Sequence, residues 1–212
     1  MSTRRAAVIL AGGESRRMGR PKAWLPLGDE TLLHRVARIV GAACPTVVVV
    51  ASPGQSLPTL PDGVVRVDDP AERAGNGPLV GALTGMRTLV ERRAELAYLG
   101  AVDAAWISTE HVEAMLAALE GDPSLQAVVP ESPPHLGERR IVHATSGAVR
   151  LPVACDAAAA LVEAGTRALM RLFDELAARR VAPSSLPDPD ALRPCNTPQD
   201  HAAAQRWIVG RS

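Results

Sequence analysis

The sequence predicts an α/β protein whose central sheet is mainly parallel and doubly wound. Short apolar runs alternate along the first half of the chain with longer stretches in which apolar residues recur at helical spacing. The runs show no polar alternation, as expected for strands that are buried on both faces of a parallel sheet. Repeated strand–helix units of this kind place ligands at the carboxyl ends of the strands. The expected strands of this half are residues 6–10, 46–51, 64–67 and 96–101.

Capping residues predict where the helices of the first half begin. Thr31 precedes apolar residues at helical spacing, and its hydroxyl can accept a hydrogen bond from the first turn. A second helix at residues 79–90 follows the Gly-Pro pair at 77–78, because proline is tolerated at the first helical position. A third helix is expected to begin after a cap at Ser108 or Thr109.

The second half of the chain is less regular. Residues 183–194 hold four prolines and are expected to form an extended connector. Thr197 as cap, Pro198 at the first position and Asp200 three residues later predict a final helix with an acidic capping box. Strands are expected at residues 127–130, 141–143 and 147–149, and helices near residues 153–163 and 166–176.

Composition excludes several classes of protein. The 212 residues, 47% of them hydrophobic, suffice for one sizeable core, so a single domain over 1–212 is expected. Basic and acidic residues balance at 23 each, which leaves no charge footprint for nucleic acid or an anionic membrane. No run approaches the ~20 apolar residues that span a bilayer. Three cysteines without Cys-x-x-Cys spacing predict neither zinc nor disulfides, and fit a soluble protein of the reducing cytoplasm.

A glycine-rich segment at residues 10–22 ends in Lys22, the only lysine of the chain. Lysine is a compact charge on a flexible stem, which suits a crowded phosphate site. The segment has neither the Gly-x4-Gly-Lys-Ser/Thr pattern of a P-loop nor the Gly-x-Gly-x-x-Gly pattern of a dinucleotide fold. Its glycines let backbone N–H groups approach a triphosphate, and Arg16, Arg17 and Lys22 can neutralise the charge.

Two acidic residues follow expected strands. Asp103 comes directly after the fourth strand, at the edge where a magnesium ion that bridges substrate phosphates is usually held by one or two carboxylates. Asp69 follows the third strand beside Asp68, and it either contacts a nucleotide or caps the next loop.

Three other features each allow two interpretations. The Gly-Pro-Leu-Val-Gly turn at 77–81 either binds the phosphate of a second substrate at a helix N-terminus or only begins the helix. Asn196 either reaches the second substrate or shapes the turn before the last helix. His143 lies between apolar residues, and we interpret it as a satisfied core histidine rather than a catalyst.

Several of these segments together resemble one family. Residues 10–22 read Leu-Ala-Gly-Gly-x-Ser-x-Arg-Met-Gly-x-Pro-Lys, similar to the signature of the nucleotidyltransferases that include molybdenum cofactor guanylyltransferase, also called molybdopterin-guanine dinucleotide synthase. The similarity continues through residues 25–28 and 77–81 to Asn-Thr-Pro-Gln-Asp at 196–200, and so covers nearly the whole chain. The resemblance implies a Rossmann-like three-layer α/β/α nucleotidyltransferase fold with a mainly parallel central sheet.

The resemblance also implies an activity, a cofactor and site residues. It implies transfer of GMP from GTP to molybdopterin with release of pyrophosphate, with Mg²⁺ as cofactor. Residues 1–108 would be the nucleotide-binding half and 109–212 the acceptor-side half. The expected nucleotide contacts are Leu10, Ala11, Gly12, Gly13, Lys22, Asp69 and Asp103, of which Asp103 would also bind the metal. Lys22, Asp103 and Arg16 are the expected catalytic residues, and Arg17, Gly77, Pro78, Gly81 and Asn196 are expected on the acceptor side.

Three alternatives stay open. The chain could be a cytidylyltransferase for the same cofactor, or a nucleotidyltransferase for a sugar or another phosphate. The glycine-rich segment indicates binding of a triphosphate more than selection of a particular base. The chain could also be a catalytically weakened nucleotide-binding partner protein, since Val-Asp-Ala-Ala at 102–105 stands where the family usually has Cys-Asp-x-Pro. The retained Lys22 and Asp103 favour an active enzyme. Docking to cofactor-delivery or target enzymes is a further expectation, whereas partners among nucleic acids and membranes are not expected.

Overall fold

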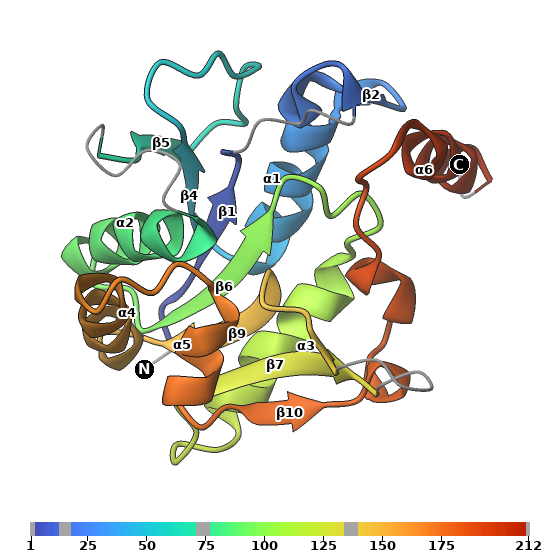
Figure 1. The fold of residues 1–212 in the computed structure, drawn as a ribbon. Helices are drawn as coiled ribbons and strands as arrows, with labels where there is room; N and C mark the ends of the chain where they lie inside the picture. The colour runs from blue at the N-terminus through green and yellow to red at the C-terminus, as the bar shows by residue number, and fades with distance from the viewer. Residues whose placement is uncertain (1–2, 13–17, 71–76, 134–139, 211–212) are drawn as a thin grey trace.

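The computed structural model of the protein describes residues 3–12, 18–70, 77–133 and 140–210 (Figure 1). Three predicted site residues, Gly13, Arg16 and Arg17, lie outside these ranges. Among the described residues, no helix has the length and apolar content that a membrane crossing requires.

Strands and helices alternate through the first half of the chain, as predicted. The described strands are β1 (Arg5–Leu10), β2 (Pro26–Leu27), β3 (Glu30–Thr31), β4 (Thr46–Ala51), β5 (Val64–Asp68), β6 (Leu96–Ala101), β7 (Ala127–Ser132), β8 (Ile141–Val142), β9 (Ser146–Arg150) and β10 (Arg179–Val181). The described α-helices are α1 (Leu32–Ala43), α2 (Pro78–Glu91), α3 (Thr109–Glu120), α4 (Val153–Glu163), α5 (Met170–Glu175) and α6 (Pro198–Val209).

The main sheet has the strand order β10-β7-β9-β6-β1-β4-β5, with β8 paired to β7. Strand β1 pairs in parallel with β4 on one side and β6 on the other, and only β9 runs antiparallel to the strands that flank it in this order. The chain passes from β1 outward to β4 and β5, and then returns to the other side of β1 as β6. The order therefore reverses between β1 and β6, and in open α/β sheets this is where the ligand crevice forms.

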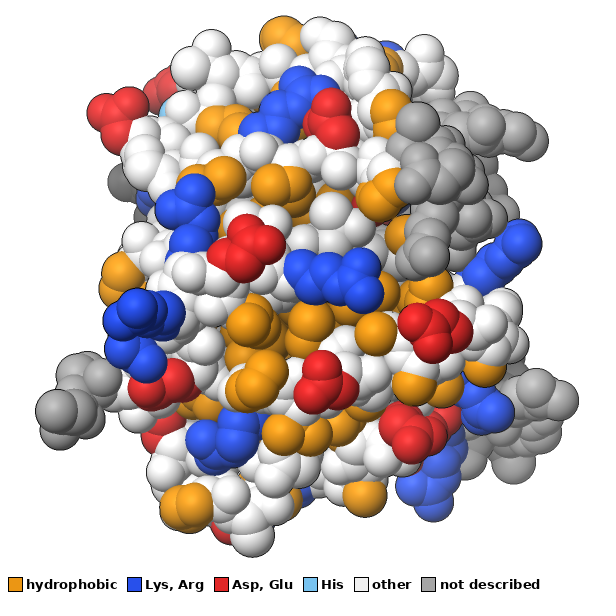
Figure 2. All heavy atoms as spheres, turned by 90° about the vertical axis from the view of Figure 1, so that its left-hand side faces the viewer, with side chains coloured by type: hydrophobic (Ala, Val, Ile, Leu, Met, Phe, Trp, Pro, Cys, Tyr) orange, Lys and Arg blue, Asp and Glu red, His pale blue; other side chains and the backbone are white. Residues whose placement is uncertain are grey.

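Two hydrophobic cores, one on each face of the sheet, make the fold three-layered. Along β1, Ala7 and Ile9 pack in the core that contains α1 and α3, whereas Ala6 and Val8 pack in the core that contains α2, α4 and α5. This double burial explains why β1 is apolar without alternation. Figure 1 shows the helices on both sides of the sheet, and Figure 2 shows the α2/α4 side, where apolar side chains reach the surface between charged ones.

The predicted helix caps are confirmed. Thr31 accepts a hydrogen bond from the backbone N–H of His34, and Ser108, rather than Thr109, caps α3. Thr197 and Asp200 form a reciprocal capping box at the start of α6. These polar side chains satisfy backbone donors that the first turn of a helix leaves unpaired, so the local sequence sets each boundary.

Two predictions for secondary structure were incomplete or wrong, and strand β10 was not predicted. The connector at 183–194 is not extended throughout, because two short 3₁₀ helices, η4 (Pro183–Ser185) and η5 (Pro189–Leu192), begin at prolines, whose fixed φ suits a first helical position. The helix expected at 166–176 is shortened to α5. Strand β10 escaped prediction because an edge strand such as Arg-Arg-Val needs no apolar run.

Gly85 lies where α2 packs closely against the sheet. A Cβ atom there would come within 2.5 and 2.8 Å of the two methyl groups of Val8. We expect Gly85→Ala to lower the free energy of unfolding by about 1–3 kcal/mol through overpacking, measured by urea denaturation.

Gly41→Ala is the matched control for this prediction. A Cβ at Gly41, also inside a helix, would lie 3.9 Å from its nearest neighbour, a methyl group of Val47. This variant should be neutral or more stable, because alanine favours a helix by up to ~1 kcal/mol over glycine. Equal effects of the two substitutions would contradict the close packing of α2 on β1.

Candidate active site

Lys22 makes hydrogen bonds to two other parts of the chain, one of them just after the carboxyl end of β6. It begins the short 3₁₀ helix η2 (Lys22–Trp24), which follows the glycine-rich segment. Its Nζ donates to Oδ2 of Asp103 at 3.0 Å and to Oδ1 of Asn196 at 2.5 Å. The side chains of Lys22 and Asp103 are 15% and 26% exposed, so the ion pair is largely but not completely buried.

The backbone on both sides of Asp103 is fixed to neighbouring segments. Val102, just before it, donates its N–H to the carbonyl of Leu10 at 3.0 Å, which extends the contact of β6 with β1. The carbonyl of Asp103 accepts hydrogen bonds from Ala105 N at 2.9 Å and from Cys195 N at 2.8 Å. The turn after the acid is thus closed by hydrogen bonds although no proline follows it. The bond to Cys195 also brings the next residue, Asn196, to the site.

Asn196 shapes the start of the last helix, as one of its two interpretations predicted, and it also contacts Lys22. Its backbone N–H donates to Oδ2 of Asp200 at 3.0 Å, so it belongs to the capped start of α6. Its side-chain oxygen meanwhile reaches Lys22. A residue predicted for the acceptor side is therefore in direct contact with the predicted phosphate-binding lysine.

Asp69 has one carboxyl oxygen, Oδ1, that finds no hydrogen-bond partner among the described residues. Its backbone N–H donates to the carbonyl of Ala51 at 2.9 Å, which holds it at the carboxyl end of β5. Oδ1 is buried and makes no hydrogen bond among the described residues. A Cβ at Gly81 would lie 3.5 Å from Oδ2 of Asp69 and 3.1 Å from Leu10, so the bare glycine leaves room for both. Burial raises the pKa of Asp69.

The start of α2 packs against the link between α4 and α5. Gly77 has a φ of +90°, and a Cβ there would come 2.8 Å from the carbonyl oxygen of Arg167. The same carbonyl accepts the N–H of Leu79 at 3.2 Å, and Pro78 has no N–H to donate. Two of the first helical positions therefore offer no free donor to the anion that the sequence led us to expect here.

Two polar side chains that were not predicted as site residues, Gln55 and His143, also make hydrogen bonds. Gln55, in the turn after β4, donates from Nε2 to the carbonyl of Ala11 at 2.9 Å. The Pro-Gly pair that precedes it is typical of a turn, but nothing in the sequence marks the amide that follows the pair. His143 shares a 2.8 Å hydrogen bond with the hydroxyl of Ser132 and is half-buried, which agrees with its interpretation as a satisfied histidine.

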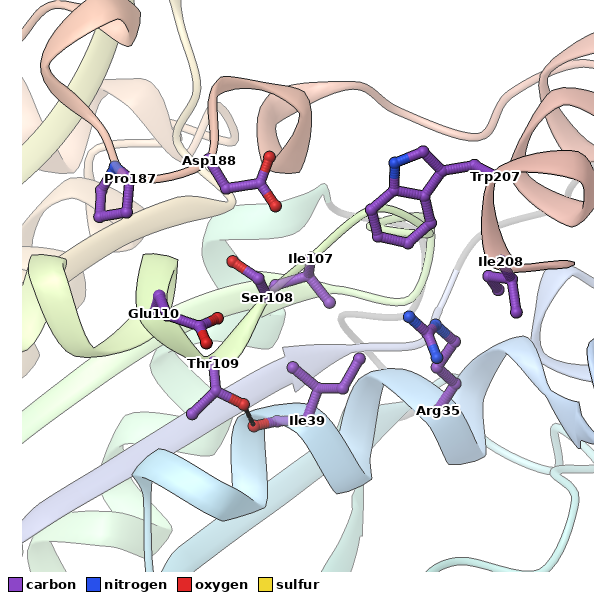
Figure 3. A pocket seen from close by; sticks show the side chains of 10 residues that line it. All are labelled: Arg35, Ile39, Ile107, Ser108, Thr109, Glu110, Pro187, Asp188, Trp207 and Ile208. Atoms are coloured by element: carbon purple, nitrogen blue, oxygen red, sulfur yellow. Dashed lines mark hydrogen bonds between the residues drawn. The ribbon is translucent and has the colours of Figure 1, made fainter. Parts of the chain in front are cut away.

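A cavity of about 600 Å³ opens between α1, the start of α3 and the end of α6 (Figure 3). Arg35 and Trp207 lie on one side of it, with the guanidinium carbon 5.9 Å from the centre of the indole ring. Asp188 and Glu110 add carboxylates to its rim. None of the predicted site residues that the structure describes lines this cavity, so it is separate from the contacts of Lys22 with Asp103 and Asn196.

A family model, the MobA-like NTP transferase domain, matches residues 7–181. The chain belongs to this family. It is accordingly a nucleotidyltransferase, and the matched MobA-like region contains both Lys22 and Asp103.

Curated relatives of this MobA-like chain carry one name, probable molybdenum cofactor guanylyltransferase. The relative from Mycobacterium marinum is 36% identical over 205 residues, which are 95% of this chain and 93% of the relative. The relative from Mycobacterium bovis is 47% identical over 110 residues, which are 51% of this chain and 53% of the relative. In that match the chain spans about half the length of the relative.

Solved structures share the fold of the MobA-like chain. The molybdopterin-guanine dinucleotide biosynthesis protein A of Archaeoglobus fulgidus matches with a TM-score of 0.68 at 15% identity, over 97% of this chain and 99% of that one. The 2-C-methyl-D-erythritol 4-phosphate cytidylyltransferase of Thermus thermophilus also matches with a TM-score of 0.68, at 18% identity over 98% and 100%. At these identities the matches show the Rossmann-like nucleotidyltransferase fold alone.

Asp69 should destabilise the ligand-free protein. Its pKa is raised in the folded state, so the folded protein binds the carboxyl proton more tightly than the unfolded chain does. Stability must then fall as pH rises from the unfolded pKa through the folded pKa, and the deficit is complete at neutral pH. We expect Asp69→Asn to raise Tm at pH 7, with an advantage that disappears in acid, measured by thermal unfolding across pH.

Asp68→Asn is the control for this effect. Asp68 is exposed and pairs with Arg66 at 2.9 Å, so its replacement should bring no gain. A lower Tm for Asp69→Asn at pH 7, or an advantage that grows in acid, would contradict the assignment of a carboxylate that is destabilised by burial at Asp69.

Proposed function

We propose that this nucleotidyltransferase transfers GMP from GTP to molybdopterin and releases pyrophosphate, to give the guanine dinucleotide form of the molybdenum cofactor. The observation that carries the proposal is the contact of Lys22 with both Asp103 and Asn196. It joins the predicted phosphate-binding segment, the predicted metal ligand and the predicted acceptor side at one crevice. The name shared by the curated relatives supports the choice of substrates.

The unpaired oxygen of Asp69 supports guanine as the base. Guanine carries two adjacent donors, N1–H and the N2 amino group, on one edge. A carboxylate is acceptor-only when ionised and can take both. Cytosine, uracil and adenine each place an acceptor next to the donor on that edge, and this acceptor would face a carboxylate oxygen. Binding guanine would give the buried Oδ1 the hydrogen bond that it lacks.

Mg²⁺ fits the donors present at the crevice. Asp103 and Asn196 offer carboxylate and amide oxygens, which are hard ligands. Among the described residues no group of three or more His, Cys, Asp or Glu could hold a metal by itself. This pattern suits a magnesium ion held by one carboxylate, Asp103, together with the phosphates of the substrate. When bound, the ion would supply charge neutralisation to those phosphates.

The proposed reaction asks the protein to align two anions. A terminal phosphate oxygen of molybdopterin attacks the α-phosphorus of GTP in line, the bond to the β-phosphate oxygen breaks, and pyrophosphate leaves. Lys22 would exchange part of its contact with Asp103 for a phosphate oxygen, which frees the Asp103 carboxylate. Alignment and charge stabilisation account for catalysis of this kind.

A covalent enzyme intermediate is not part of the proposal. Burial raises the pKa of the Cys195 thiol, next to the site, to about 11, so it is protonated at neutral pH and a poor nucleophile. The acceptor phosphate itself supplies the attacking oxygen.

Pyrophosphate release tests the proposed function directly. The purified full chain is incubated with Mg²⁺ and each of the four NTPs, with and without molybdopterin. We expect release with GTP only when molybdopterin is present, and loss of release when Mg²⁺ is chelated. A preference for CTP would replace guanylyl transfer by cytidylyl transfer, and no release with any NTP would overturn the function.

Loss of the lysine should abolish most of the activity. We expect Lys22→Ala to lower turnover on the order of 10²–10³, the usual effect of removing one donor that stabilises charge in the transition state. Steady-state kinetics with GTP and molybdopterin provide the measurement, and circular dichroism checks the fold.

Arg38→Ala is the control for the lysine variant. Arg38 is an exposed cation paired with Glu30 at 2.7 Å, and its removal should leave turnover unchanged. Turnover of Lys22→Ala close to that of the wild type would exclude the phosphate-binding role.

A further inference from the structure

The hydrogen-bond ladder between β1 and β4 stops one step early. The two strands pair in parallel with Leu10 opposite Val50, and Ala11 N still donates to Val50 O at 2.8 Å. In a regular parallel pair the next hydrogen bond would run from the N–H of Ser52 to the carbonyl of Ala11. That bond is absent from the structure, although both groups belong to described residues.

The side-chain amide of Gln55 takes the place of this bond. Its Oε1 accepts from the N–H of Ser52 at 2.9 Å, and its Nε2 donates to the carbonyl of Ala11 at 2.9 Å. Both backbone groups are therefore satisfied, but with an amide between them. The ends of β1 and β4 must stand apart by the width of that amide.

The turn that carries Gln55 is built to present the amide. Gly54 has a φ of +72°, a value that favours glycine, and the N–H of Gln55 donates to the carbonyl of Ser52 at 3.0 Å. Backbone and side chain of Gln55 thus both bond to Ser52, which fixes the direction of the side chain toward Ala11.

Gln55 also contacts β5, the strand that directly precedes Asp69. Its carbonyl accepts from Arg66 at 2.9 Å, and Arg66 in turn pairs with Asp68 at 2.9 Å. Asp68 directly precedes Asp69, whose unpaired oxygen is the proposed base acceptor. One residue therefore contacts the backbone of the glycine-rich segment on one side and the strand that carries Asp69 on the other.

We propose that Gln55 is a positioning residue of the nucleotide site, which holds the Ala11–Gly12 backbone away from Ser52 so that the nucleotide can enter between β1 and Asp69. The spacing is tight, since a Cβ at Gly12 would already lie 3.1 Å from the hydroxyl oxygen of Ser52. Closure of the missing ladder bond would draw these segments together and narrow the site. The inference rests on the proposed nucleotide-binding function and adds a residue to it.

Gln55→Glu separates the two hydrogen bonds of the amide. The introduced carboxylate can still accept from Ser52 N–H, but when ionised it cannot donate to the carbonyl of Ala11 and is repelled by it. We expect the Kd for GTP at pH 7.5 to rise about tenfold or more, the usual cost of leaving one buried partner unpaired. At about pH 5 the carboxyl group begins to bind a proton and can donate again, so the ratio of variant Kd to wild-type Kd should fall.

Gln205→Glu is the matched control, because Gln205 also donates its amide to a backbone carbonyl, that of Pro26, but on α6. Its Kd ratio should stay near one at both pH values. Isothermal titration with each of the four NTPs supplies the Kd values, and thermal unfolding supplies Tm. Should Gln55→Glu not fold, Gln55→Met, of similar length and without either hydrogen bond, is measured at pH 7.5 instead.

The outcomes separate this inference from the proposed function. An unchanged Kd with a lowered Tm would make Gln55 a purely structural residue and overturn the inference. A raised Kd that does not recover in acid would also overturn it, because the donor to Ala11 would not be responsible. Tight wild-type binding of an NTP other than GTP would overturn the guanine assignment alone. The ratio of the Gln55→Glu Kd to the wild-type Kd would then be measured with that nucleotide. Binding of no NTP by the wild type would overturn both.

Discussion

The ammonium group of Lys22 joins three distant parts of the chain at the candidate active site of this protein. Asp103 stands 81 positions from it in the sequence and Asn196 stands 174 positions from it, yet both accept its hydrogen bonds. Each partner reaches the lysine by a different route: Asp103 by following β6, which pairs with β1, and Asn196 through the capped start of α6. The predicted phosphate-binding lysine therefore joins the predicted metal ligand to a residue predicted for the acceptor side.

Much of the fold could be predicted because its signals are local. Apolar runs without alternation indicated β1, β4 and β6, and side-chain caps at Thr31 and Thr197 indicated the helix starts. The edge strand β10 and the 3₁₀ turns of the proline-rich connector were not predictable in this way, because pairing with a neighbouring strand and packing, rather than periodicity, decide them. Whether the chain is one domain stays a prediction.

The site was predictable only in part, for a related reason. Lys22 stands out in the sequence because it is the only lysine, and Asp103 stands out because it is a carboxylate that follows an apolar strand. The structure brings the two side chains together. The roles of these residues stay predictions, and Gly13, Arg16 and Arg17 lie outside the described residues. Gln55 gave no signal, since it acts through one backbone carbonyl that is 44 residues away. Contacts of a side chain with distant backbone leave no pattern in a sequence.

The distance along the chain between Lys22 and Asn196 has a consequence for biosynthesis. At the usual elongation rate of about 5–20 residues per second, the lysine leaves the ribosome on the order of ten seconds or more before its amide partner. Throughout this time the glycine-rich segment and β1 exist without the residue that completes the lysine's surroundings. The contact between Lys22 and Asn196 can thus form only after every described strand of the sheet has been synthesised.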